Sequence, residues 1–164
     1  MIMLHDGENV FNYRIAGVAT HNGKVLVHRG PGDDFWAFPG GRGEMGESAA
    51  DTLRREMLEE LQTSVHVGNL LWLVENFFEY NGQHYHELGL YFAFSFPPDS
   101  PLLELEESEF CDELGVKLIF RWQPLDALDQ ITIVPACLLP RLSALENPME
   151  HLVNRENGAG KSQM

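Results

Sequence analysis

The residues best suited to chemistry are four glutamates, Glu47, Glu56, Glu59 and Glu60. If residues 48–61 form a helix, Glu56 and Glu60 lie one turn apart with their carboxylates side by side, and Glu59 flanks them. Like charges at this spacing repel unless the face is fully solvated or a cation binds to it. Carboxylates together with a backbone carbonyl and water form the oxygen cage that Mg²⁺ or Mn²⁺ prefers. The spacing therefore allows two interpretations, a solvated acidic face and a divalent metal site.

The sequence before this helix and the charge of the chain favour the metal site. Residues 35–41 read Phe-Trp-Ala-Phe-Pro-Gly-Gly, and a tight glycine turn lets a backbone carbonyl approach a ligand closely. The chain has 11 Lys and Arg against 25 Asp and Glu, a formal net charge of -14. Because this charge repels nucleic-acid backbones, we expect no nucleic-acid partner. A phosphate substrate would need cations recruited locally.

Turn residues and periodicity predict the elements that must position these side chains. Predicted strands cover residues 11–20, 24–29, 65–79, 83–96 and 116–122, with hairpin turns at Asn22-Gly23 and Asn81-Gly82. The helix over 48–61 has Ser48 as its N-cap, and a second helix is expected over 135–145, where Pro140 would break or kink it. Residues 97–114 are expected to form a loop. Antiparallel strands with helices between and after them predict an α+β or mixed α/β sandwich.

The chain length predicts one compact domain over residues 1–146, followed by a flexible C-terminal tail over 147–164. Cys111 and Cys137 show no metal-ligand spacing and are expected to be free thiols in a reducing compartment. The charged residues among positions 1–10 argue against a signal peptide, and no apolar run is long enough to span a membrane. These observations predict a cytoplasmic protein without a membrane partner.

The segment 41–63 resembles the Nudix box. Gly41, five further residues, Glu47, seven further residues and then Arg55-Glu56-Met57-Leu58-Glu59-Glu60 follow the family pattern. Two positions depart from it, because Gln62 replaces the usual glycine and Thr63 replaces an aliphatic residue. The glycine normally ends the helix in a left-handed conformation, so Gln62 should change the C-cap geometry and leave the metal ligands intact.

The resemblance covers about residues 11–145, because residues 24–29, 35–41 and 121–126 also look like conserved parts of the family. It implies the Nudix fold, an α/β/α sandwich around a mixed β-sheet. It also implies a MutT-like, Mg²⁺- or Mn²⁺-dependent pyrophosphohydrolase that cleaves the diphosphate linkage of a nucleoside diphosphate joined to another group. The small-molecule substrate itself is not indicated by the box. Many relatives dimerise, so a homodimer is an expectation.

The resemblance also assigns roles to individual residues. Glu56, Glu59, Glu60 and the backbone carbonyl near Gly41 are the implied metal ligands, and Glu56, Glu59 and Arg55 are the implied catalytic residues. Glu47 would pair with Arg55 and lock the loop onto the helix; the alternative is an ordinary surface ion pair. The general base is expected to be Glu56 or Glu59. Acids of the loop over 104–113 are the alternative, with Glu107, Glu109 and Glu113 as candidates.

Substrate binding is assigned to Arg14, Arg29 and Glu47. The two arginines suit phosphate binding, although each could be an ordinary strand-edge cation. His84 and His86 share one strand face and Glu87 points the other way, so this cluster could bind metal or form a polar strand surface. Trp36 and Trp122 could stack on a base or pack in the core.

Two other functions compete with hydrolysis. A Nudix isomerase acting on an allylic diphosphate usually needs a reactive cysteine near the box, and neither cysteine lies near it in sequence. A Nudix-like nucleotide-binding module or regulator without catalytic activity typically loses box glutamates, whereas Glu47, Glu56, Glu59 and Glu60 are all present.

Overall fold

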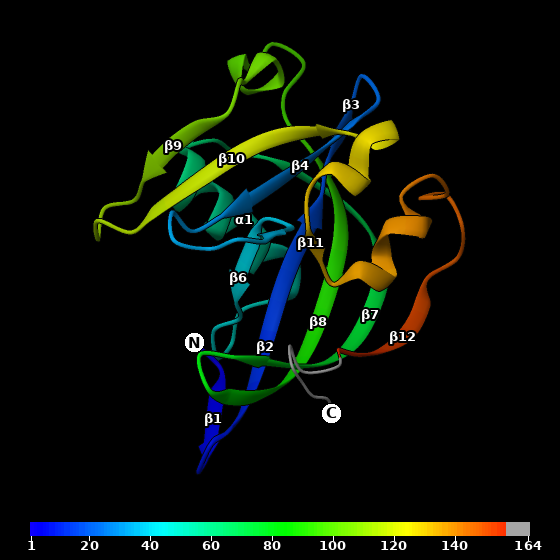
Figure 1. Ribbon diagram of the computed structural model, residues 1–164. Helices are drawn as coiled ribbons and strands as arrows, with labels where there is room; N and C mark the ends of the chain where they lie inside the picture. Colours follow the sequence, from blue (N-terminus) through cyan, green and yellow to red (C-terminus); the bar gives the residue numbers. More distant parts are fainter. Residues whose placement is uncertain (157–164) are drawn as a thin grey trace.

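Two six-stranded sheets and one α-helix make up the computed structural model, which describes residues 1–156 (Figure 1). The first sheet has the order β1-β2-β8-β7-β12, with β6 beside β2, and the second has the order β11-β5-β4-β10-β9, with β3 beside β4. The first contains β1 Met3–Asp6, β2 Asn9–Val18, β6 Gly40–Arg42, β7 His66–Tyr80, β8 Gln83–Ser95 and β12 Glu150–Arg155. The second contains β3 Thr20–His21, β4 Lys24–Arg29, β5 Trp36–Ala37, β9 Ser108–Cys111, β10 Lys117–Pro124 and β11 Ile133–Val134.

The helix α1, Ala49–Leu61, lies on one side of the sheets, and 3-10 helices after β10 lie on the other (Figure 1). The 3-10 helices span Pro101–Glu104, Leu125–Gln130 and Ala136–Arg141. Both sheets are mixed, because β2 runs parallel to β8 and β12 runs parallel to β7. This arrangement confirms the predicted mixed α/β architecture. Within residues 1–156 no helix is long and apolar enough to cross a membrane.

Two hydrophobic clusters hold the layers together. Alternate residues of a strand point to opposite faces, so Ile15 of β2 packs toward α1 while the adjacent Ala16 packs away from it. On the α1 side, Leu53 and Met57 are fully buried together with Ile15 and other strand residues. The helix therefore docks through the apolar stripe expected from its sequence, which fixes the direction of its acidic residues.

The predicted hairpins are present, but three segments differ from expectation. The predicted loop over 97–114 contains β9, which pairs antiparallel with β10. Glu109 within this strand and Glu107 just before it hid it, since Glu is depleted in strands. The predicted helix over 135–145 is only the 3-10 helix Ala136–Arg141, which contains Pro140. Proline has no N–H to continue an α-helix, so the chain forms this short tight turn instead.

The expected flexible tail over 147–164 is wrong for its first part. Residues 150–155 form β12, which adds to the edge of the first sheet beside β7. Asn154 Nδ2 donates to Asn76 Oδ1 at 2.8 Å, and His151 lies 2.8 Å from Glu75. These contacts extend the folded unit beyond residue 146. The rest of the expected tail, residues 157–164, lies outside the described residues.

Candidate active site

Both ends of α1 are set by local geometry. Ser48 caps the start, because its Oγ accepts a hydrogen bond from the Asp51 N–H at 3.2 Å and donates to Asp51 Oδ2 at 2.8 Å. Gln62 ends the helix in the left-handed conformation, with φ 53° and ψ 37°, and its N–H donates to the Leu58 carbonyl at 2.9 Å. The helix therefore has the predicted bounds, and position 62 has the backbone that normally requires glycine.

Gly41 and Glu56 fit together as a pair. The Glu56 side chain is only 14% exposed, and it lies directly over the Gly41 backbone. A Cβ at position 41 would overlap the carboxylate of Glu56, and a Cβ at position 40 would overlap the Ile15 carbonyl. Both glycines are thus needed for close approach: Gly40 to place β6 beside β2, and Gly41 to admit the carboxylate. The glycine turn and the first predicted metal ligand meet in space.

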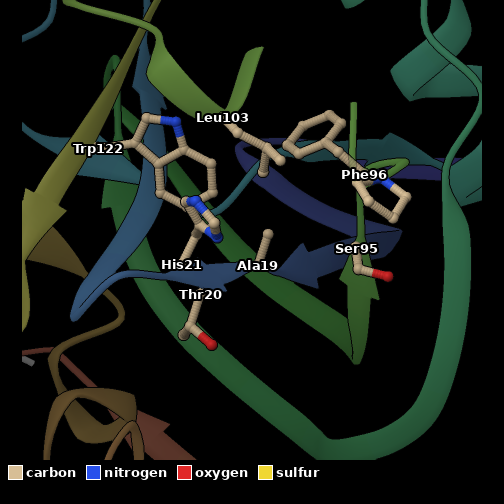
Figure 2. A pocket seen from close by; sticks show the side chains of 8 residues that line it. Ala19, Thr20, His21, Ser95, Phe96, Leu103 and Trp122 are labelled. Carbon is tan, nitrogen blue, oxygen red and sulfur yellow. The ribbon is translucent and has the colours of Figure 1, made fainter. Parts of the chain in front are cut away.

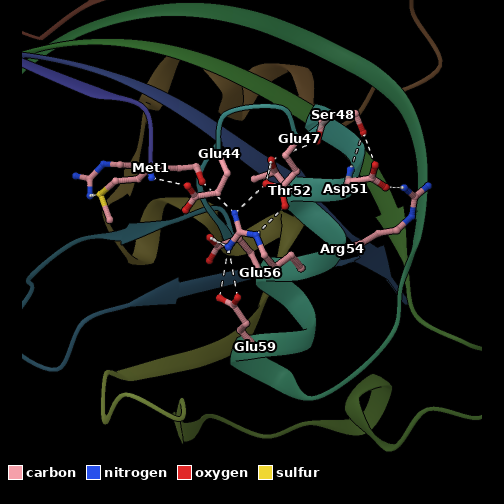
Figure 3. A network of polar contacts seen from close by, with 11 residues as sticks. Met1, Glu44, Glu47, Ser48, Asp51, Thr52, Arg54, Glu56 and Glu59 are labelled. Carbon is pink, nitrogen blue, oxygen red and sulfur yellow. Dashed lines mark hydrogen bonds and ion pairs between the residues drawn. The ribbon is translucent and has the colours of Figure 1, made fainter.

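Arg55 locks the loop before the helix onto the helix itself. Its Nε donates to Glu47 Oε2 at 2.9 Å and its Nη2 donates to Glu47 Oε1 at 3.0 Å and to the Arg42 carbonyl at 3.2 Å. Thr52 Oγ1 also donates to Glu47 Oε1, at 2.6 Å. Figure 3 shows Glu47, Glu56 and Glu59 converging on this one guanidinium. These hydrogen bonds hold the pKa of Glu47 down at about 2.

The structure therefore gives Glu47 a partner other than substrate. Both of its oxygens accept hydrogen bonds from Arg55 or Thr52, so Glu47 holds the loop to the helix; its predicted part in substrate binding stays a prediction. Arg55 also donates to Glu56 Oε1 at 2.9 Å and lies 3.5 Å from Glu59. This bidentate, partly buried arrangement is the locking interaction and differs from a simple exposed ion pair.

Glu60 occupies a very different environment, one turn beyond Glu56. Its side chain is 11% exposed, and its Oε2 is buried without a hydrogen-bond partner in the part of the chain that the structure describes. Burial, and then the charge of Glu56, raise the pKa of Glu60 to about 8. Burial also raises the pKa of Glu56. Buried carboxylates of this kind ionise only when a positive charge lies beside them.

His28, which the sequence analysis did not single out as a site residue, lies close to this unpaired oxygen. Its Nδ1 lies 3.8 Å from Glu60 Oε2 and is itself buried without a partner among residues 1–156. Burial, and then the charge of Arg14, lower the pKa of His28 to about 3, so the ring is neutral at neutral pH. In the sequence, His28 directly follows the apolar run 25–27 of β4 and precedes Arg29, a position with no distinct signal of its own.

The donor set fits a divalent cation that keeps part of its coordination for water and substrate. The described residues contain no group of three or more His, Cys, Asp or Glu side chains closed around one point. Mg²⁺ does not require such a cage, since one or two carboxylates with water and phosphate oxygens normally suffice. The unpaired Oε2 of Glu60 and the Glu56 carboxylate over Gly41 supply that partial set. Glu59 is 52% exposed at the edge of it.

The two predicted phosphate contacts lie in different surroundings. Arg14 of β2 donates to the Phe38 carbonyl at 2.8 Å, and its charge reaches Glu56, where it opposes the rise in pKa. Its charge is therefore close enough to act on the box carboxylates. Arg29 donates through its Nη1 to backbone carbonyls of residues 30, 31 and 33. Its guanidinium lies 5.0 Å from the centre of the Trp36 ring, and that of Arg121 lies 5.6 Å from the centre of the same ring. Arg29 thus organises a loop at the end of β4.

The acidic segment over 104–113 brings one unexpected residue toward the site. Glu107 lies 3.5 Å from Arg121, and Glu109 lies 3.5 Å from Lys117, so both face their own hairpin. Glu113 is exposed. Asp112 lies near enough for its charge to raise the pKa of Glu60. Only the pairing of β9 with β10 carries Asp112 there, and no local pattern in the sequence indicated it.

The remaining candidates do not join the box. His84 and His86 are exposed on one face of the first sheet, where His86 stacks on Phe77 at 4.5 Å. Glu87 is buried on the opposite face, the one that also carries Ala16 and points away from α1, which we call the inner face. Trp36 and Trp122 both pack in the hydrophobic clusters. Trp122 also borders a pocket of about 290 Å³ (Figure 2). That pocket is lined by Ala19, Thr20, His21, Ser95, Phe96, Pro98, Leu103 and Trp122, which include no box residue.

Comparison with known proteins gives one family and several solved structures. The family model described as "NUDIX domain" matches residues 12–142. A UDP-X diphosphatase superposes with a TM-score of 0.60 at 19% identity, covering 86% of this chain but 66% of that one, so the match spans just under two thirds of its length. A MutT protein from Bacillus halodurans superposes with a TM-score of 0.54 at 18% sequence identity, and the match covers 93% of this chain and 94% of that one. An ADP-ribose pyrophosphatase from Streptococcus suis superposes with a TM-score of 0.53 at 15% identity, and the match covers 87% of this chain and 98% of that one. These structures share the fold. No curated protein matches the sequence significantly.

Proposed function

Because the chain belongs to the Nudix domain family, we propose that it is a Mg²⁺- or Mn²⁺-dependent hydrolase of a diphosphate linkage in a nucleoside diphosphate joined to another group. The observation that carries this proposal is the environment of Glu56 and Glu60. Both carboxylates are largely buried one turn apart, and burial raises the pKa of each. Such carboxylates cost stability unless they serve a bound cation, and a cation also resolves the repulsion between an acidic chain and a phosphate.

The proposed ligands are Glu56, Glu59, Glu60 and the backbone carbonyl of Gly41. When bound, the metal ion would neutralise diphosphate oxygens and lower the pKa of the attacking water. Gly41 contributes by lacking a side chain, since any Cβ would displace the Glu56 carboxylate. His28 of β4 lies 3.8 Å from Glu60, and Asp112, directly after β9, is near enough for its charge to act on Glu60.

The other residues bind, orient and accept protons. Arg14, held at the Phe38 carbonyl beside Glu56, is the proposed phosphate contact. Glu59, the most exposed of the three box carboxylates, or Glu56 accepts the proton of the water that attacks phosphorus. Arg55 is a positioning residue, because it ties Glu47 and the preceding loop to the helix that carries the ligands.

Two alternatives make different predictions. A nucleotide-binding regulator on the same fold would bind metal and nucleotide without turnover. An isomerase would act on an allylic diphosphate, and Cys111 does lie next to Asp112. The retained box carboxylates favour hydrolysis over the regulator, and the distance of both cysteines from the box in the sequence favours hydrolysis over the isomerase. A cytoplasmic location, a homodimer and a small-molecule nucleotide partner remain part of the proposal.

The deciding experiment measures product release across a panel of nucleotide diphosphate derivatives with Mg²⁺ or Mn²⁺. The panel includes nucleoside triphosphates, nucleotide sugars, ADP-ribose, dinucleoside polyphosphates, coenzyme A and one allylic diphosphate. The Glu56→Gln/Glu60→Gln double variant serves as the matched control for contaminating activity. Hydrolysis by the wild type alone supports the proposal. Binding of metal and nucleotide without any hydrolysis would favour the regulator.

A further inference from the structure

A row of polar side chains crosses the first sheet on its inner face, one row beyond Arg14. Asn12 of β2 lies directly opposite Glu87 of β8, Glu87 lies opposite Asn76 of β7, and Asn76 lies opposite Asn154 of β12. Asn12, Asn76 and Glu87 are only 2%, 5% and 7% exposed. We refer to these four residues as the polar row. A buried carboxylate between amides is costly unless its hydrogen bonds are used.

The hydrogen bonds of the polar row are only partly used. Asn12 Nδ2 donates to Glu87 Oε2 at 3.0 Å, and Asn154 Nδ2 donates to Asn76 Oδ1 at 2.8 Å. Asn12 Oδ1 is buried and has no hydrogen-bond partner within residues 1–156. The only hydrogen bond of Glu87 to the described residues uses Oε2, which leaves Oε1 available. Asn12 and Glu87, joined by one hydrogen bond, therefore each keep an acceptor oxygen that is not used within residues 1–156, on two side chains that are more than nine-tenths buried.

The polar row is connected to the proposed metal site through Arg14. Arg14 lies two positions after Asn12 on β2, a step of about 7 Å on the same face. Gly89 lies opposite Arg14, and the Tyr91 ring folds over Gly89, where a Cβ would crowd it at 2.9 Å. Glu87, Gly89 and Tyr91 are alternate residues of β8 and so share one face; burial, and then the charge of Glu87, raise the pKa of Tyr91. The row thus lies one step beyond the phosphate contact.

Aromatic side chains flank the other side of the polar row. Phe78 and Tyr85 occupy the next inner-face positions of β7 and β8 and stack at 5.0 Å. Tyr80 contacts Tyr85 at 6.3 Å and Phe35 at 6.0 Å, and its hydroxyl donates to Asp33 at 3.2 Å. Tyr80 is 36% exposed, so this aromatic group is the solvent-facing end of the same face.

We propose that Glu87, together with Asn12, binds the non-phosphate part of the substrate by accepting hydrogen bonds from two adjacent donors on the substrate. The edge of a guanine base and the cis-diol of a ribose both present such donors to one carboxylate, and the aromatic group supports a planar ring or sugar beside it. Entry requires the Phe35–Tyr80 contact to open. The inference rests on the proposed function, because Arg14 and the box carboxylates hold the diphosphate.

A purely architectural role is the competing explanation, in which the polar row only fixes strand register. Asn154 provides the control, since it contacts Asn76 at the far end of the row and lies two strands from Glu87. Under the architectural explanation, Glu87→Gln and Asn154→Ala both lower Tm and reduce activity equally toward all substrates. Under our proposal, only Glu87→Gln changes the choice between substrates.

The test compares kcat/KM for matched nucleotide sugars that differ only in the base, guanine or adenine, or only in the presence of the 2′- and 3′-hydroxyls. Wild type should prefer one member of a pair by at least about tenfold, since a site built for donors rejects analogues that lack them. Preference for guanine identifies the base edge, and preference for the diol identifies the ribose. Glu87→Gln should abolish the preference, mainly through KM, while Asn154→Ala keeps it. Glu87→Asp, which keeps the carboxylate, should restore part of it.

Two outcomes would contradict the inference, and they differ from failure of the proposed function. In an enzyme that hydrolyses the panel, unchanged preference in Glu87→Gln would overturn the recognition role alone. Equal loss toward every substrate in Glu87→Gln and Asn154→Ala would establish the architectural role. If wild type hydrolyses no member of the panel, the proposed function fails first. If Glu87→Gln does not fold, as judged by circular dichroism, Asn12→Ala, which removes the other proposed acceptor, is compared with Asn154→Ala in its place.

Discussion

The two ends of α1 hold the same residue type in opposite environments. Near the helix start, Glu47 has both oxygens hydrogen-bonded to Arg55 and Thr52, and these bonds hold its pKa down at about 2. Near the helix end, Glu60 has a buried oxygen without a partner, and burial raises its pKa to about 8. Both carboxylates belong to the same box. Their surroundings indicate that one is held for structure and that the other is kept available for a cation.

This difference shows how a structural acid can be separated from a functional one. A carboxylate with satisfied hydrogen bonds stabilises the fold at neutral pH, whereas a buried and unsatisfied one costs stability that only a ligand can recover. Removing the first should harm stability more than chemistry. Removing the second should harm chemistry and relieve the metal-free fold.

Removal of divalent metal should have the largest effect on turnover, because it affects all of the proposed metal ligands between Glu56 and Glu60 at once. EDTA should abolish turnover, and added Mg²⁺ or Mn²⁺ should restore it, since the acidic site otherwise repels the substrate. Product release before and after chelation measures this. Full activity in metal-free buffer would rule out the proposed mechanism and the functional reading of Glu60.

Glu56→Gln and Glu60→Gln should each lower kcat by at least about a hundredfold while the fold survives. In EDTA the Tm of Glu60→Gln should equal or exceed that of wild type, because a buried, unpaired carboxylate is replaced by a neutral group of the same size. Steady-state kinetics and thermal unfolding measure both effects. Glu107→Gln is the matched control and should keep its activity; a large loss there would move the general base to the acidic hairpin.

Glu47→Gln should act mainly on stability, lowering it by about 1 kcal/mol, or about 2 to 4 °C in Tm. The pKa of Glu47 falls from 4.5 in the unfolded chain to about 2 in the folded one. Its contribution is therefore fully present above pH 4.5 and is lost as pH falls toward 2. The Tm difference between wild type and Glu47→Gln should shrink over that window. Glu109→Gln, at an exposed site, should show no such trend.

Gln62→Gly should have the smallest effect, and it tests whether the active site extends as far as the C-cap of α1. Because Gln62 is left-handed, with φ 53°, glycine should stabilise the protein by up to about 1 kcal/mol. Metal-saturated kcat should stay nearly unchanged. Gln62→Ala keeps a Cβ and should bring no gain in Tm, which separates backbone strain from loss of the side chain. A large change in kcat at constant Tm would place Gln62 in the site.

Local features of the sequence were enough to predict the elements that depend on interactions between residues close together in the chain. Ser48 capping, the apolar stripe of Leu53 and Met57, and the glutamate spacing predicted α1 with its observed bounds. The Asn-Gly turns likewise predicted the β3–β4 and β7–β8 hairpins. In each case the signal lies within a few residues of the element it specifies, so no distant contact was needed.

Tertiary structure decided what surrounds those residues. His28 reaches Glu60 only because β4 packs beneath α1, and Asp112 approaches it only because β9 pairs with β10. The polar row exists because Asn12, Glu87 and Asn76 come into register across three strands from distant parts of the chain. The sequence by itself thus determined which acids the box contains. Strand pairing and burial, which depend on long-range contacts, determined which of them is paired, which is unsatisfied, and what lies beside it.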